Sequence, residues 1–485
     1  CSNDPVFDMH WGLKNSFNEA VDINACQAWN IATGQGVKIA IHDNGTLLTH
    51  TDLVANLSPL SFNVATGTSP SVLSTQQPDH GTFVAGICGA AQNNNLGITG
   101  VAPNSTLISI SNPSGYNALT YCEKQALGIN WARNTQVNAD IINCSWGIHS
   151  ASAVYNSAVL EEAINNATTL GRDGKGCIVV FASGNDAYAM RYPANNPNLN
   201  LLTVGAITPT GEKPFFSAFG NTLDLAAPGV CITSTAANGA ITEDEGTSFA
   251  APHVAGVAAL MLSVNPCLTR QQVYDIIEQT AQKVNNTVSP FTYNLTAGRP
   301  NGAWSNKVGY GLLDAYAAVK MAQGMGSDDS YIKDNLADLG VEPNTSTIVW
   351  NSPDIWLRNL PDGGTTHQNA TTGTNYVYVK VRNKGCIATN PNDYVKLYQT
   401  KNTWGCILQP IAFLGTQTIP AIASGQDTIL MFPVQLIFNM GHQSNIENAV
   451  IQLIAEIVPY GSVSNSINTD NYMQLAQNSN DIAVK

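Results

Sequence analysis

The sequence is poor in charge, and basic residues are the scarcer kind. Only 11% of its 485 residues are charged, whereas about 25% are charged in an average soluble protein. The 34 acidic residues outnumber the 21 basic ones, and the net charge is −13. Binding to nucleic acid or to an anionic membrane surface needs clustered Lys and Arg. The composition therefore predicts neither nucleic-acid binding nor a basic membrane-surface protein.

Long apolar runs are missing as well. The sequence has no run of about 18 apolar residues, the length that crosses a bilayer as a helix, so no transmembrane segment is predicted. It begins with neither Met nor a basic-then-apolar leader, which indicates a mature form. Low charge with many Asn, Thr, Ser and Gly favours an extracellular or envelope location. The length predicts two to four domains, or a large one and a smaller one.

The ten cysteines do not follow a metal-binding pattern. There is no C-x-x-C and no Cys/His cluster with zinc spacing, so no structural zinc is predicted. Cys88, Cys144 and Cys177 lie in apolar segments, where cysteine is often a small buried hydrophobe; disulfides are the alternative. Cys386 and Cys406 lie close enough in the C-terminal part to form a pair.

The first cysteine has a different context. Cys1 is followed by Ser-Asn-Asp, which resembles the start of bacterial lipoproteins, whose first Cys is lipidated. The prediction is a possible lipid anchor at Cys1, on a bacterial-type cell-surface or secreted protein. A disulfide to Cys26 is the alternative.

Strands and helices alternate from about residue 36 to 322. Short apolar strands are expected over 37–42, 107–110, 141–142, 177–182 and 201–204, and helices over 120–133, 152–170 and 247–263. Short apolar runs suit a parallel sheet that is covered on both faces. The alternation predicts an α/β domain with a doubly wound, mostly parallel sheet. Its functional site is expected at the carboxyl ends of the strands.

The pattern changes after residue 323. We predict an α/β domain over 1–323, a linker over 324–347 and an all-β domain over 348–485. In the last of these, strands are expected over 375–382, 394–398, 428–432 and 449–458, separated in part by Gly- and Asn-containing turns. Strands at this spacing predict an antiparallel, Ig-like β-sandwich.

Three segments carry residues that can work together chemically. Asp43 ends a predicted strand, and His80 and Ser248 each open a predicted helix. A serine hydroxyl needs a base to take its proton, and imidazole has a suitable pKa. A carboxylate behind the imidazole holds it in one tautomer. Alone, each residue is more often a turn or cap residue, but together they predict an Asp-His-Ser triad.

The segments around these residues resemble a known family. The runs HGTFVAG at His80 and GTSFAAP at Ser248, in the chain order Asp, His, Ser, are similar to those of subtilisin-like serine peptidases, the subtilases. The resemblance covers roughly residues 9–322. Asn44 departs from the Thr or Ser that is usual before Gly45. The resemblance implies a subtilisin-like fold and a serine endopeptidase that hydrolyses peptide bonds, with protein or peptide as its substrate.

The resemblance also implies further site residues. Asn185 would supply the side chain of the oxyanion hole. The substrate-binding segments would be Ser145, Trp146 and Gly147 on one side and Ala182, Ser183 and Gly184 on the other. Arg191 would lie near the base of the pocket for the residue before the scissile bond. There it would either favour acidic or polar side chains, or pair with Asp186 and narrow the pocket.

A structural calcium is the remaining implication. Asp52 in Thr-His-Thr-Asp-Leu resembles a family calcium ligand, and Asn94, in a loop about one residue longer than the family pattern, would complete an all-oxygen shell. No catalytic cofactor is expected.

The competing function is a non-catalytic surface adhesion or assembly protein that keeps a subtilase shell. Envelope proteins are possible further partners.

Overall fold

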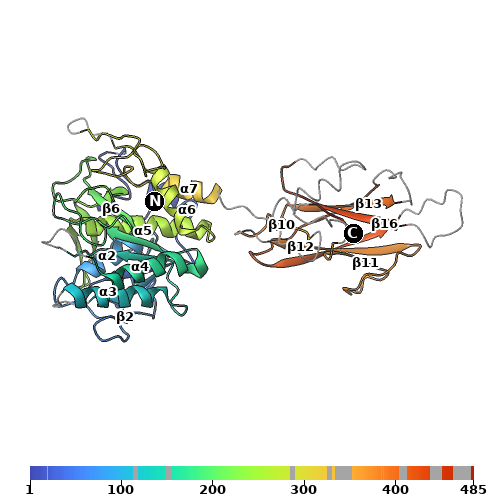
Figure 1. The fold of residues 1–485 in the computed structure, drawn as a ribbon, viewed down its shortest axis with the longest axis horizontal. Helices are drawn as coiled ribbons and strands as arrows, with labels where there is room; N and C mark the ends of the chain where they lie inside the picture. Colours follow the sequence, from blue (N-terminus) through green and yellow to red (C-terminus); the bar gives the residue numbers. More distant parts are fainter. Residues whose placement is uncertain are drawn as a thin grey trace. The chain divides into compact units, whose positions relative to one another are not determined.

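The computed structural model describes residues 1–18, 20–112, 118–148, 156–284, 290–324, 330–333, 352–383, 385, 387–402, 412–436, 450–462 and 482–484. The chain divides into two compact units, Cys1–Met325 and Gly326–Lys485 (Figure 1). Each unit has buried hydrophobic clusters of its own.

A seven-stranded sheet forms the centre of the first unit. In spatial order its strands are β2 (Phe62–Asn63), β3 (Thr106–Ser111), β1 (Lys38–Asp43), β4 (Ile141–Cys144), β5 (Ile178–Ala182), β6 (Leu202–Ile207) and β7 (Leu225–Pro228). Every neighbouring pair is parallel. The predicted parallel α/β architecture is confirmed, and all carboxyl ends lie at one edge.

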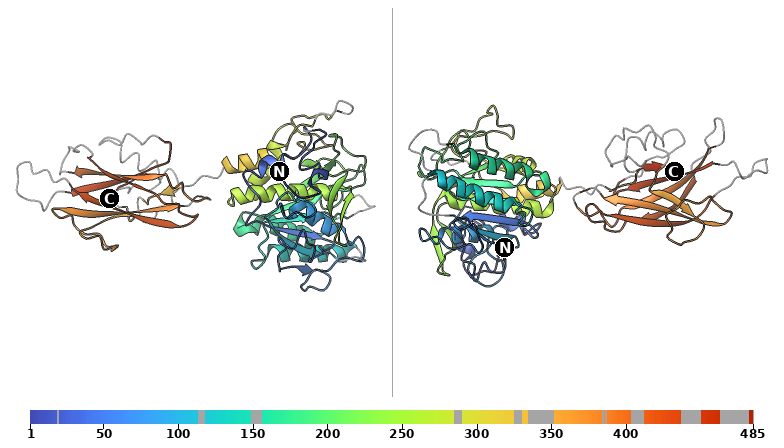
Figure 2. Two further views of the ribbon diagram at one scale, coloured as in Figure 1. Left: turned by 180° about the vertical axis from the view of Figure 1, so that it is seen from behind. Right: turned by 60° about the horizontal axis from the view of Figure 1, so that its bottom comes forward.

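Helices cover both faces of this sheet. On one side lie α2 (His80–Gly89), α5 (Thr247–Val264), α6 (Arg270–Thr280) and α7 (Ala315–Gly324), and on the other α3 (Ala118–Arg133) and α4 (Ala158–Leu170). The pair α3 and α4 lie side by side (Figures 1 and 2). Successive β1 side chains alternate between the two cores: Ile39 and Ile41 enter the first, and Ala40 enters the second. This double coverage explains why the strands are apolar on both faces.

The longest core helix is α5. By length and composition it is the one helix, among the residues that the structure describes, that could cross a membrane, but 83% of it is buried inside the protein. Its Ala-rich sequence lets it pack closely on strands and helices all round. It is therefore a core helix of this unit.

The second unit contains two antiparallel sheets. One holds β10 (Ser330–Tyr331), β11 (Ile355–Arg358), β12 (Thr374–Asn383) and β15 (Asp427–Gln435), and the other β13 (Tyr394–Asn402), β14 (Ala412–Thr418), β16 (Val450–Val458) and β17 (Ile482–Val484). Both contribute to one core, through residues such as Val379 and Ile457. Within the described residues of this unit, the antiparallel sheets are consistent with the all-β prediction. The predicted linker over 324–347 contains a strand, because Tyr331 pairs with Arg382.

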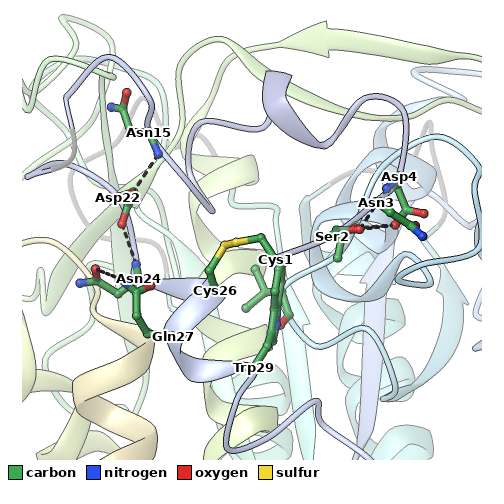
Figure 3. The surroundings of a disulfide bond; sticks show 12 residues. Cys1, Ser2, Asn3, Asp4, Asn15, Asp22, Asn24, Cys26, Gln27 and Trp29 are labelled. Carbon is green, nitrogen blue, oxygen red and sulfur yellow. Dashed lines mark hydrogen bonds between the residues drawn. A yellow bond between two sulfur atoms is a disulfide. The ribbon is translucent and has the colours of Figure 1, made fainter.

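The N-terminus is tied to the first unit by a disulfide. Cys1 is bonded to Cys26 of the short helix α1 (Ala25–Ala28), as Figure 3 shows. A sulfur atom in a disulfide cannot also carry a thioether-linked lipid. The sequence favoured a lipid anchor at Cys1. The structure instead has the alternative, a disulfide between Cys1 and Cys26.

Three further cysteines that the sequence singled out are free. Cys88, Cys144 and Cys177 are buried thiols, and burial raises the pKa of each one. They are core residues, which is one of the two alternatives that the sequence left open. The predicted pair of Cys386 and Cys406 lies outside the described residues.

Candidate active site

The end of β1 and the start of α2 bring a carboxylate and an imidazole together. His80 Nδ1 lies 2.6 Å from Asp43 Oδ1, and that oxygen also accepts the backbone N–H of Asn44 at 2.7 Å. The approach depends on two glycines. A Cβ on Gly81 would collide with the Gly45 carbonyl, and Gly45 itself has a φ of +88°. Gly45 and Gly81 thus allow α2 to start directly beside the turn that follows β1.

The electrostatic surroundings of His80 favour its protonated form. Burial by itself lowers the pKa of His80, but the charge and hydrogen bond of Asp43, together with the charge of Asp244, outweigh it, so that the pKa is raised. Asp43 is 2% exposed. A buried carboxylate on Nδ1 fixes the ring tautomer and leaves Nε2 as the nitrogen that can act as a base.

Ser248 faces the same cavity as this pair. It is the second residue of α5, and the cavity has a volume of about 460 Å³. The predicted site residues on its lining are Asp43, His80, Ser145, Trp146, Gly147, Asn185, Arg191 and Ser248. Ser248 Oγ donates to the backbone carbonyl of Ser145 at 3.1 Å. The structure thus brings the three triad residues to one cavity with the serine hydroxyl on a backbone acceptor.

The side-chain amide of Asn185 has a fixed orientation. Its Oδ1 accepts two hydrogen bonds from Thr247, one from the backbone N–H at 3.0 Å and one from Oγ1 at 2.8 Å. Because the oxygen is held by the residue next to Ser248, the NH₂ group is the part of the amide that remains for the cavity. A donor at this place suits a developing oxyanion.

The second predicted substrate-binding segment, Ala182, Ser183 and Gly184, is buried along its whole length. Ala182 and Ser183 are almost fully buried, and Ser183 Oγ donates to the carbonyl of Ala218 at 2.9 Å. Gly184 donates its backbone N–H to Thr247 Oγ1 at 3.1 Å. Ser145, Trp146 and Gly147 line the cavity as predicted for a substrate-binding segment, whereas Ala182, Ser183 and Gly184 are not among its lining residues.

Arg191 is held by a neighbouring carboxylate. Its Nε lies 2.6 Å and its Nη2 3.1 Å from the two oxygens of Asp186. Its stem packs beside Gly147 and Gly184, where an added Cβ would meet it at 2.7 and 2.9 Å. Of the two interpretations of Arg191, this geometry matches the one in which it pairs with Asp186 and narrows the pocket.

Two features of the site were missed in the sequence. The first is an antiparallel hairpin, β8 (Ile232–Thr235) and β9 (Ile241–Asp244), which leads into the serine segment. Asp244 and Glu245 at its end line the cavity. The second is Asn143, which is fully buried and donates from Nδ2 to Ser145 Oγ at 2.9 Å. Closeness in sequence to Ser248 and to Ser145 was the available signal.

The predicted calcium ligands lie together but do not form an oxygen shell. Asn94 Nδ2 donates to Asp52 Oδ1 at 2.8 Å, and the backbone N–H of Ile98 donates to Asp52 Oδ2 at 2.8 Å. Asn94 Oδ1 is occupied by the N–H of Leu96, and the carbonyl of Gly97 by the N–H of Val6. Donors, and not the oxygens that calcium needs, point at the carboxylate. Calcium does not fit this arrangement.

A second carboxylate holds the same loop. Asp4 accepts the backbone N–H groups of Asn93 and Asn95 at 2.9 and 3.1 Å, and the hydroxyls of Thr99 and Ser2 at 2.7 Å each. Figure 3 shows Asp4 and Ser2 close to the disulfide. No group of three or more His, Cys, Asp or Glu side chains suited to a metal occurs among the described residues.

Comparison with known proteins identifies the family. A sequence model of the Subtilase family matches residues 34–311, more than half of the chain. The chain belongs to the subtilase family. Over 294 residues it is 36% identical to M-protease of Shouchella clausii, covering 59% of this chain and 65% of that protein. Identity to Subtilisin Savinase of Lederbergia lenta is also 36% over 294 residues, covering 59% of this chain and 92% of the relative.

A solved structure supports the same assignment. A protease from Pseudoalteromonas arctica superimposes with a TM-score of 0.55 at 29% identity, covering 66% of this subtilase and 99% of that chain. The family match lies within the first unit. The α/β unit of this subtilase is therefore the part that carries the family fold.

One histidine of this subtilase lies next to the site without joining it. His42 precedes Asp43 in β1, and strand alternation predicts that it points to the opposite face. It is fully buried, its ring packs edge-on against Trp146 with centroids 5.5 Å apart, and burial lowers its pKa to about 3. His42 is therefore a neutral core residue.

Proposed function

We propose that this subtilase is a serine endopeptidase that uses Asp43, His80 and Ser248 as its triad and Asn185 in its oxyanion hole. The observation that carries the proposal is the 2.6 Å contact between His80 Nδ1 and Asp43 Oδ1 at a cavity that Ser248 and Asn185 also line. The family match supports the reaction type. The substrate class is protein or peptide.

The proposed reaction proceeds in two halves. Ser248 rotates its hydroxyl from the Ser145 carbonyl toward His80, whose Nε2 takes the proton as Oγ bonds to the scissile carbonyl carbon. The negative charge on the substrate oxygen is stabilised by the Asn185 NH₂ group and by the backbone N–H of Ser248. His80 then protonates the leaving amine, and an acyl-enzyme forms. Water, deprotonated by His80, releases the acid and restores Ser248.

The test is casein hydrolysis by a Ser248→Ala variant. Casein cleavage and labelling by a serine-directed fluorophosphonate should both be lost. Ser263→Ala is the matched control, since Ser263 lies at the far end of α5 and its Oγ donates to Leu260. Full peptidase activity in Ser248→Ala, or label on another residue, defeats the proposal. Inactive wild-type protein would favour the adhesion or assembly function.

We also propose an extracytoplasmic location. The Cys1–Cys26 disulfide supports it, because disulfides persist in oxidising compartments. A lipid anchor at Cys1 would use the same sulfur atom. Intact mass of the native N-terminal peptide, before and after reduction, separates the two states: a disulfide-linked pair of peptides supports the bridge, and an added lipid mass supports the anchor.

For the second unit we propose an accessory role. The proposed division is a peptidase domain over 1–323, a connecting segment over 324–347 and an Ig-like β-sandwich over 348–485. Two antiparallel sheets with one shared core support the sandwich. Deleting the unit should leave the hydrolysis of a short peptide intact, because every proposed catalytic residue precedes it; loss of peptide hydrolysis in a folded deletion variant would contradict an accessory role.

A further inference from the structure

Acidic side chains border the nucleophile on one side. Glu243, Asp244 and Glu245 follow one another and are exposed, and Gly246 and Thr247 separate them from Ser248. Asp244 and Glu245 line the cavity that holds Ser248 and His80, whereas Glu243 does not. Two carboxylates are therefore part of the wall of the space that receives the peptide.

The hairpin that carries these residues is attached to the histidine helix. In β8, Ser234 Oγ donates to the carbonyl of Phe83 and Thr235 Oγ1 to the carbonyl of Thr82, both at 2.7 Å. At the hairpin turn, the N–H of Ala237 donates to Asp79 Oδ1 at 2.7 Å. The first turn of α2 and the hairpin thus form one block, and Asp244, the last residue of β9, lines the same cavity as His80, the first residue of α2.

The positively charged side chain on the described lining of the cavity is paired with another carboxylate. Among the described residues that line it, Arg191 is the one Lys or Arg side chain. It lies beside Gly147 and is bound through two nitrogens to Asp186. The charge of Asp244 also contributes to the raised pKa of His80. The His80 side of the cavity therefore has a negative potential that no cation of the described lining offsets.

The direction of the reaction tells which part of the substrate meets this side. His80 must reach the nitrogen of the leaving amine, because it gives that nitrogen a proton. The chain that continues from this nitrogen is the part of the substrate after the scissile bond. The acyl part lies instead toward Gly147, Asn185 and Arg191.

We infer that Asp244 and Glu245 are specificity-determining residues that select Lys or Arg at the first or second position after the scissile bond. The inference rests on the proposed function, because it needs a peptide bound at Ser248. Opposite charges at this rim lower the free energy of the bound complex and speed encounter. An acidic residue at the same positions meets repulsion. Solvated carboxylates that never touch substrate are the competing explanation.

The experiment compares quenched fluorescent peptides that are identical except for Lys-Lys or Glu-Glu after the scissile bond. For wild-type protein, kcat/KM for the Lys peptide should exceed that for the Glu peptide by about two- to fivefold, within the range expected of an exposed charge pair. The ratio should fall toward one in Asp244→Asn/Glu245→Gln. Glu243→Gln, which removes one neighbouring negative charge outside the cavity, should keep the wild-type ratio. Salt near 1 M should reduce it, since the Debye length is then about 3 Å.

The outcomes separate the inference from the proposed function. A wild-type ratio near one, or equal ratios in wild type and the double variant, overturns the selectivity while leaving an active peptidase. Cleavage that persists in Ser248→Ala overturns the proposed function as well. A ratio that falls equally in Glu243→Gln assigns the effect to net charge, and also overturns the role of Asp244 and Glu245.

Discussion

Ser145 and Ser248 exchange hydrogen bonds across 103 positions of sequence. Ser145 Oγ donates to the backbone carbonyl of Ser248 at 2.7 Å, and Ser248 Oγ donates to the backbone carbonyl of Ser145 at 3.1 Å. Asn143 Nδ2 in turn donates to Ser145 Oγ at 2.9 Å. The backbone of the nucleophile is thus tied to the carboxyl end of β4, and its hydroxyl rests on a backbone acceptor until it turns to His80.

Removing the Ser145 hydroxyl should slow catalysis. Ser145→Ala deletes the bond that positions Ser248 and leaves Asn143 Nδ2 without its acceptor. We expect kcat/KM to fall by about tenfold, or about 1.4 kcal/mol, and the free energy of unfolding to fall by about 1–3 kcal/mol. Peptide hydrolysis and urea unfolding measure the two effects.

The control for this variant is Ser217→Ala. Ser217 is also fully buried, and its Oγ accepts the N–H of Ala206 at 3.0 Å, away from the cavity. It should lose stability but keep kcat/KM. If Ser145→Ala and Ser217→Ala have the same kinetics, the bond between Ser145 and Ser248 has no positioning role.

The acid limb of the pH profile should lie above the ordinary pKa of histidine. His80 must be neutral to accept a proton, and the Asp43 and Asp244 carboxylates raise its pKa against the opposing effect of burial. Activity should therefore be lost as pH falls through a value above about 6.5. Plots of kcat/KM against pH measure it.

The Asp244→Asn variant tests the cause of this shift. Removing its charge should move the acid limb to lower pH, because one of the groups that stabilise the imidazolium is gone. Glu123→Gln, a change of an exposed acid on α3, should leave the limb in place. An acid limb that stays fixed in Asp244→Asn would contradict the electrostatic contact with His80.

The positions of the three proposed triad residues could be predicted because local backbone structure places each one. Asp43 ends a strand, and His80 and Ser248 begin helices, so the order of elements along a parallel sheet brings them to one edge. Because both faces of the sheet are buried, its strands could be recognised in the sequence as short apolar runs. The motifs and the fold therefore support each other.

What the sequence did not reveal depends on contacts between distant or weakly patterned segments. The strand β9 has exposed side chains along most of its length, so no alternation marks it. Asp4 reaches a loop 89 positions away, and nothing in the local sequence predicts that partner. The Ser248 hydroxyl is oriented by its hydrogen bond to the Ser145 backbone carbonyl. A contact with a distant backbone group cannot be predicted from the local sequence.

Releasing Arg191 should change the preference for the residue before the scissile bond. In Asp186→Asn the guanidinium loses its charged partner, so kcat/KM for a substrate with Glu at that position should rise about fivefold relative to one with Gln. Arg191→Ala should widen the pocket without favouring Glu. Profiling with both variants checks this, and an unchanged preference in both would show that Arg191 does not face the substrate.

We expect the hydrogen bonds of Asp4 to hold the loop over 93–99 in place without a metal ion. Its carboxylate accepts two backbone N–H groups and two hydroxyls, and Asp52 accepts two further donors. We therefore expect chelator treatment to leave the melting temperature unchanged. Asp4→Asn should lower the free energy of unfolding by about 2–3 kcal/mol, since charged acceptors make the stronger hydrogen bonds.

Asp8→Asn is the matched control for the loop. Asp8 is exposed, and its replacement should change stability by no more than about 0.5 kcal/mol. Thermal unfolding with calcium or with chelator separates the explanations. A saturable rise in melting temperature with calcium means that the ion binds the folded state. If Asp4→Asn abolished that rise, Asp4 would be a ligand of calcium and not its replacement.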